Sequence, residues 1–114
     1  MKNNDYKQKA LKVKELYDEL NKLKGENKWG FMQYAEGMVG DTGDLIKMLM
    51  AKANLRGYKG GDLNDDIEHE LSDILWSLII IAEELDIDLL ESFGRKMDTL
   101  AERVEEKIDK LKSI

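Results

Sequence analysis

Residues 64–85 read NDDIEHELSDILWSLIIIAEEL, and this stretch decides the fold. It contains neither Pro nor Gly, and it shows no alternation of apolar and polar residues that would indicate a strand. Its second half is apolar on nearly every side, at Ile74, Leu75, Trp76, Leu78, Ile79, Ile80 and Ile81. A helix with apolar residues all round is buried on more than one side. We therefore expect this helix to pack within its own chain and against another subunit.

The rest of the chain follows the same helical pattern. Its 114 residues include no Pro, and Leu, Lys, Glu and Met are abundant, so the sequence predicts an all-α fold. The expected helices lie at about 5–24, 31–55, 64–85 and 88–111. Asn64 and Asp88 are the expected N-caps of the last two. We expect a single domain over residues 1–114, a four-helix bundle completed by oligomerisation as a homodimer or homotetramer.

Composition limits the classes of partner. The chain carries 24 acidic and 18 basic residues, and the net charge of −6 argues against general binding to nucleic acid or to anionic membranes. The longest apolar stretch, residues 78–82, is far too short to span a bilayer. The absence of Cys excludes disulfides and thiolate metal sites. We expect a soluble, cytoplasmic protein.

Two pairs of acidic residues, Asp41 with Asp44 and Glu70 with Asp73, lie among apolar residues in the expected helices. Residues three apart share one helix face, with Cβ atoms about 5–6 Å apart. If the four carboxylates converge, their mutual repulsion raises their proton affinities unless divalent cations neutralise them. Ligation by oxygen alone suits Mg²⁺, or Mn²⁺ as a substitute, better than zinc. The pattern predicts a magnesium site, although one isolated acidic pair usually belongs to a solvated helix face.

These acidic segments also resemble a known family. The segment 40–45 reads GDTGDL, 25 residues separate Asp44 from Glu70, and the segment 70–76 reads ELSDILW. Together they are similar to the E-x-x-E and E-x-x-D signature of the MazG-like all-α nucleoside triphosphate pyrophosphohydrolases. The resemblance covers well over half of the chain. The second motif matches closely, whereas Asp41 and Asp44 stand where the family usually has Glu.

The resemblance implies a reaction and a set of site residues. Magnesium held by Asp41, Asp44, Glu70 and Asp73 would bind a nucleoside triphosphate, and water would attack the α-phosphorus to give a monophosphate and pyrophosphate. These four positions are therefore the expected metal ligands and catalytic residues. The resemblance also makes Lys96 and Arg103 expected substrate-binding residues, as contacts for phosphate. Apart from the resemblance, Lys47, three residues after Asp44, is a further candidate for phosphate, and Trp29 is the expected stacking residue for the base.

The same residues allow other interpretations. The basic side chains are equally typical of a solvated helix surface. Trp76 follows an apolar run and is expected in the core, and His69 is expected on the surface rather than as a ligand. The substrate could be another pyrophosphate-linked nucleotide, such as phosphoribosyl-ATP. The chain could also be a catalytically weak helical binding or regulatory protein.

Overall fold

The structure is a computed structural model that describes residues 3–114, and every regular element in that range is a helix. The helices are α1 (Asn3–Leu23), α2 (Phe31–Lys52), α3 (Leu63–Glu84) and α4 (Leu89–Lys112). The all-α prediction is confirmed, with each helix boundary within about three residues of the expected one. Whether the chain forms one domain remains a prediction.

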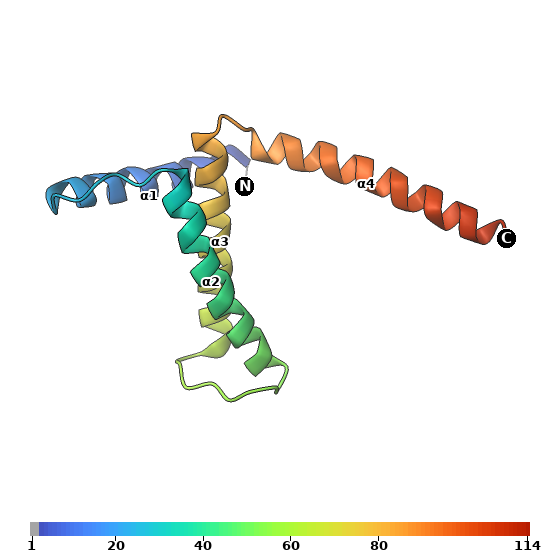
Figure 1. Cartoon of the computed structure of the whole chain (residues 1–114), viewed down its shortest axis with the longest axis horizontal. Coiled ribbons are helices and arrows are strands. Elements are labelled where there is room, and N and C mark those ends of the chain that lie inside the picture. The colour runs from blue at the N-terminus through green and yellow to red at the C-terminus, as the bar shows by residue number, and fades with distance from the viewer. Residues whose placement is uncertain (1–2) are drawn as a thin grey trace.

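The α2/α3 hairpin forms the main tertiary contact. The two helices run antiparallel along most of their length and are joined by the loop at residues 53–62 (Figure 1). Tyr34 of α2 and Ile80 of α3 are 2% and 0% exposed, and both pack against Ala10 of α1. The small core therefore lies where α1, α2 and α3 meet, at the end of the hairpin away from its connecting loop.

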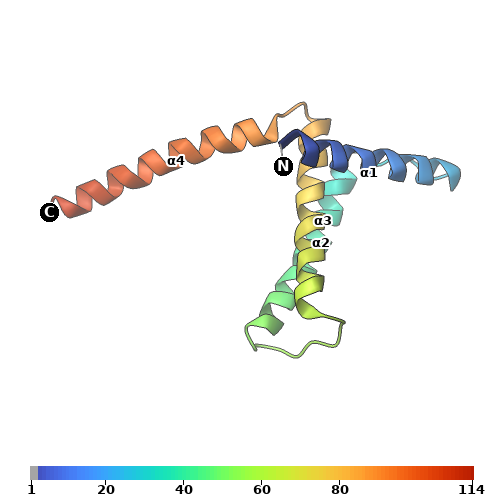
Figure 2. The ribbon, with the colours of Figure 1, turned by 180° about the vertical axis from the view of Figure 1, so that it is seen from behind.

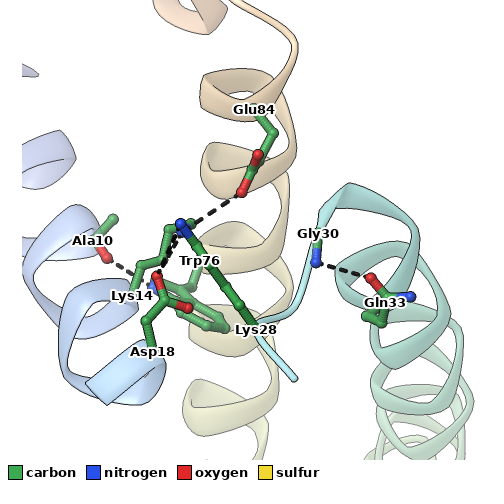
Figure 3. Close-up of polar contacts among 8 residues, drawn as sticks. All are labelled: Ala10, Lys14, Asp18, Lys28, Gly30, Gln33, Trp76 and Glu84. Carbon is green, nitrogen blue, oxygen red and sulfur yellow. Dashed lines mark hydrogen bonds and ion pairs between the residues drawn. The ribbon is translucent and has the colours of Figure 1, made fainter. Parts of the chain in front are cut away.

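α1 crosses this end of the hairpin and is held there by polar contacts (Figure 3). The Trp76 indole Nε1 donates a 3.0 Å hydrogen bond to the Ala10 carbonyl oxygen. Lys14 Nζ lies 2.8 Å from an Asp18 oxygen and 3.5 Å from an oxygen of Glu84 on α3. The hydrogen bond to Asp18 raises the pKa of Lys14. These contacts fix the position of α1 relative to the face of α3 that carries Trp76.

α4 projects away from the other three helices, and both views show it as a separate arm (Figures 1 and 2). The chain consequently measures 65 × 41 × 28 Å with a Cα radius of gyration of 18.7 Å. A compact domain of this length has a radius of about 13 Å. Residues 3–114 of one chain thus do not form a closed four-helix bundle.

Local sequence explains most helix ends. Gly25 follows α1 with a φ of 73°, a conformation that suits Gly after a helix. Asp88 is the N-cap of α4 as predicted, and its side chain accepts a hydrogen bond from the Glu91 amide.

The prediction that Asn64 is the N-cap of α3 is wrong. Asp62 caps α3 by accepting from the Asp65 amide, whereas the Asn64 side chain accepts from Lys52 on α2.

Candidate metal centre and adjoining cavity

Three of the four predicted ligands converge between α2 and α3. One carboxylate oxygen each from Asp41, Glu70 and Asp73 lies within 4.8 Å of the others. Glu70 Oε2 is buried and has no hydrogen-bond partner among the described residues. A buried oxygen without a donor is energetically costly, and three carboxylates at this separation suit a hard divalent cation. The donor set therefore fits Mg²⁺ or Mn²⁺.

The electrostatic interactions within the cluster also favour a bound cation. Burial, followed by repulsion from Asp73 and Asp44, raises the pKa of Asp41. Burial, followed by repulsion from Asp41, Asp44 and Asp73, raises the pKa of Glu70. No Lys or Arg among the described residues forms an ion pair with these acids, and the only such contact is His69 Nε2 at 3.2 Å from Asp73. Within residues 3–114, therefore, little positive charge compensates the negative charge of the cluster.

The raised pKa values predict a specific pH dependence in EDTA. The folded state binds these protons more tightly than the unfolded state, so stability increases as pH falls through the raised pKa values towards the ordinary carboxyl values. Asp41→Asn mimics the protonated form and should melt higher than wild type at neutral pH. That difference in Tm should shrink as pH falls. Thermal melts in EDTA at several pH values, with Glu36→Gln as the control, test this, and a pH-independent difference would contradict it.

Asp44 and Lys47 lie at the margin of the cluster. Asp44 is exposed and outside the group of three close oxygens, so its predicted role as a direct ligand lacks the geometric support that the other three have. It still lies near enough to raise the pKa of Asp41 and Glu70. Lys47, one turn further along α2, is exposed and forms no ion pair with any described acid.

A cavity of about 580 Å³ opens beside the acids. Asp41 and Asp73 form part of its wall, so the cluster and the cavity are continuous. The other lining residues come from α1, α2, α3 and the segment before α2, and they are Val13, Tyr17, Leu20, Asn21, Lys24, Trp29, Tyr34, Gly37, Ser72, Trp76 and Ser77. This volume falls in the range of small-molecule sites, and a mainly apolar wall with a few polar groups is typical of them.

The aromatic residues of the cavity form a connected group. Trp29 is 44% exposed and meets Tyr34 edge to face, with ring centroids 5.4 Å apart. Tyr34 in turn meets Trp76 at 5.3 Å, and Trp76 meets Tyr17 at 5.8 Å. Trp29 thus lies in the cavity wall, where its predicted role requires it. Trp76 packs against the core as expected and also reaches the cavity.

The contribution of α1 to this cavity was missed by sequence reasoning. Tyr17 and Asn21 of α1 line the cavity together with Lys24, which directly follows the helix, yet the sequence shows only an ordinary amphipathic helix without a motif there. No local signal distinguishes them, because their role depends on the angle at which α1 crosses the hairpin. His69 is exposed as predicted, but its contact with Asp73 places it next to the acids.

Lys96 and Arg103 are not brought to the acids within one chain. Both are exposed on α4, which extends away from the hairpin (Figure 1). The sequence assigns both residues to the last helix, but it carries no information about the direction in which that helix leaves the hairpin. Their predicted contact with phosphate has no support from the geometry of a single chain.

The loop between α2 and α3 is anchored at Tyr58. Its hydroxyl donates a hydrogen bond to the Asp66 carboxylate in the first turns of α3. This bond, with smaller contributions from burial and from the charges of Asp66 and Glu70, raises the pKa of Tyr58 to about 12. The Tyr58 ring also packs over Gly60, where an added Cβ would collide with it. The loop at residues 53–62 is therefore anchored to α3 near the middle of the loop.

Comparisons of the chain with protein families, with curated protein sequences and with solved structures found no match. Within residues 3–114, no helix combines the length and the apolar character needed to cross a bilayer.

Proposed function

We propose that this protein is a magnesium-dependent nucleoside triphosphate pyrophosphohydrolase. It would act on standard or modified nucleotides as a homo-oligomer in the cytoplasm, with a role in nucleotide-pool housecleaning. One observation carries the proposal: the carboxylates of Asp41, Glu70 and Asp73 converge at the edge of a cavity rich in aromatic residues. The resemblance of segments 40–45 and 70–76 to the MazG-like signature supports it.

The chain supplies separate groups for the phosphates and for the base. Asp41, Glu70 and Asp73 would hold the cation, with Asp44 close enough to add negative charge. A bound divalent cation would neutralise phosphate oxygens and lower the pKa of a bound water. The cluster also offers carboxylate oxygens that can accept the proton of the attacking water. No protein nucleophile is needed.

The cavity wall suits a nucleoside. Trp29 and Tyr17 present aromatic rings for stacking, which binds any base without strong sequence preference. Asn21 offers an amide that can both donate and accept hydrogen bonds, as the polar edge of a base requires. Lys24 adds one positive charge to a wall that otherwise carries the negative charges of Asp41 and Asp73. The aromatic part and the acidic part of the cavity therefore match the two ends of a nucleotide.

A pyrophosphate-release assay tests the proposal. The purified protein is incubated with a panel of standard and modified NTPs and dNTPs, with Mg²⁺ or with EDTA, and the products are separated. We expect equal amounts of monophosphate and pyrophosphate, with Mg²⁺ only. Release of inorganic phosphate and a diphosphate would contradict the proposed site of attack.

The negative outcomes are informative as well. If the protein binds Mg²⁺ but turns over no member of the panel, the substrate is another pyrophosphate-linked nucleotide, and phosphoribosyl-ATP is the next to assay. If calorimetry detects no Mg²⁺ binding by the folded protein, the enzyme proposal is rejected in favour of a helical binding or regulatory protein.

Trp29→Ala should weaken substrate binding more than it slows the chemical step. Loss of one stacking partner costs about 1–3 kcal/mol, so KM should rise by roughly 5- to 150-fold with a smaller change in kcat. Phe31→Ala is a matched control, because Phe31 is also aromatic and 44% exposed but does not line the cavity. Equal effects of the two substitutions in steady-state assays would show that Trp29 has no special part in binding.

A further inference from the structure

α4 carries an uncovered apolar face along its whole length. The α4 stripe consists of Leu90, Phe93, Met97, Leu100, Val104, Ile108 and Leu111. These residues recur every three or four positions, so they share one side of the helix. Each is between 41% and 71% exposed, although such a stripe normally faces a packing partner.

A second uncovered apolar face lies on the hairpin. The hairpin outer face consists of Val39, Ile46, Leu71, Leu75 and Leu78, which are 41–74% exposed. On α3, at about 100° per residue, Leu71 and Leu78 lie roughly 140–160° round the helix from Trp76, which contacts α1. α1 therefore covers one side of the hairpin and leaves this other side open.

We propose that the α4 stripe of one copy docks on the hairpin outer face of a second copy, and that the contact is reciprocal. Each chain exposes both surfaces, so a two-fold dimer covers both without any other partner. α4 is about 36 Å long at 1.5 Å per residue. A strip about 10 Å wide, counted on both surfaces of both contacts, buries on the order of 1,400 Å², close to a standard stable interface.

Charge favours the same pairing. Lys96, Arg103, Lys107 and Lys110 lie along one edge of the α4 stripe. Residues 31–84, which form the hairpin and its loop, carry eleven acidic and four basic side chains. The hairpin as a whole therefore carries a net negative charge, which favours its association with the basic edge of α4. The arrangement does not depend on the proposed enzyme activity.

The first test is the mass of the protein in solution. Light scattering at micromolar concentration should give twice the chain mass of 13.1 kDa, or a higher even multiple. Leu100→Asp and Leu75→Asp, one on each surface, should each raise the dissociation constant of the dimer more than about 100-fold. Thr99→Asp, on the opposite side of α4, should leave it unchanged. Circular dichroism verifies that each variant keeps its helices.

The second test identifies which surfaces touch. The chain has no Cys, so single cysteines can be introduced cleanly. A short thiol-reactive cross-linker should join Leu75→Cys chains to Leu100→Cys chains when the two are mixed and allowed to exchange subunits. Each variant alone should give little cross-linked dimer, because the docked residues belong to different faces.

Three results would overturn the proposal. A wild-type protein that stays at 13.1 kDa has no such interface. Strong self-cross-linking of Leu100→Cys without the mixed product would show that two α4 helices pair with each other. Strong self-cross-linking of Leu75→Cys without the mixed product would show that two hairpins pair and leave α4 free.

Discussion

Replacing Glu70 with Gln is expected to reduce pyrophosphate release at least about 100-fold. Substitution of a residue that only supports a metal ligand already costs up to about 100-fold, and a direct ligand should matter at least as much. Glu70 supplies one of the three close oxygens, and its Oε2 is buried without a hydrogen-bond donor. Gln keeps the size of the side chain but removes its negative charge and one anionic oxygen. Cation affinity should fall together with activity, and isothermal calorimetry with Mg²⁺ measures this separately.

The same substitution should not harm the fold in EDTA. Removing the charge of this side chain relieves the burial and the charge repulsion that raise the pKa of Glu70, so the variant should melt at or above the temperature of wild type. Glu68→Gln is the control, because Glu68 is exposed on α3 two residues earlier and outside the cluster. A variant that keeps full activity, or one that loses activity only because it unfolds, would remove Glu70 from the proposed site.

Ile80→Ala is expected to cost about 2–5 kcal/mol of stability, the range for truncating a buried aliphatic side chain. Ile80 is fully buried where α1, α2 and α3 meet, in contact with Ala10 and Tyr34. The cavity left behind would loosen the junction that positions α1 over the site. A loss of this size lowers Tm by roughly 10 °C or more in a chain of this length.

Ile114→Ala is the matched control for this prediction. It makes the same chemical change at a residue that is 98% exposed, where the expected effect is within about 0.5 kcal/mol. Melts should be compared at one protein concentration, because association adds to apparent stability. Similar melting of the two variants would mean that the junction of the three helices contributes little to folding.

Some structural features followed from local pattern. The four helices were predictable because the spacing of apolar residues, the absence of Pro and the turn at Gly25 act over a few neighbouring residues. Asp88 could be identified as a cap for the same reason. The error at Asn64 arose because Asp62, two residues earlier, is also a good capping residue, and in the structure Asp62 accepts from the Asp65 amide while Asn64 accepts from Lys52.

The candidate site was only partly visible in the sequence. Glu70 and Asp73 share one face of α3, so spacing alone brought them together. Their carboxylates come close to that of Asp41 only because α2 and α3 pack with a particular register. The family resemblance implied that the two acidic pairs meet, and the structure of the hairpin brings three of the four acids together. Asp44 lies about one turn beyond Asp41 on α2, and its carboxylate is not among the three close oxygens. The spacing of three residues between Asp41 and Asp44 does not show which of the two faces α3 more closely.

The sequence by itself determined the helices, the acidic pairs and the apolar faces, because each depends on periodicity within one segment. Tertiary structure decided which faces meet. It placed Tyr17 and Asn21 of α1, with Lys24 just after that helix, in the wall of the cavity that adjoins the acids. It also carried Lys96 and Arg103 away from the acids on α4. The direction in which a helix leaves a turn depends on long-range packing rather than on its own residues. For this reason the sequence predicted a last helix at about 88–111 but not the direction in which that helix leaves the hairpin.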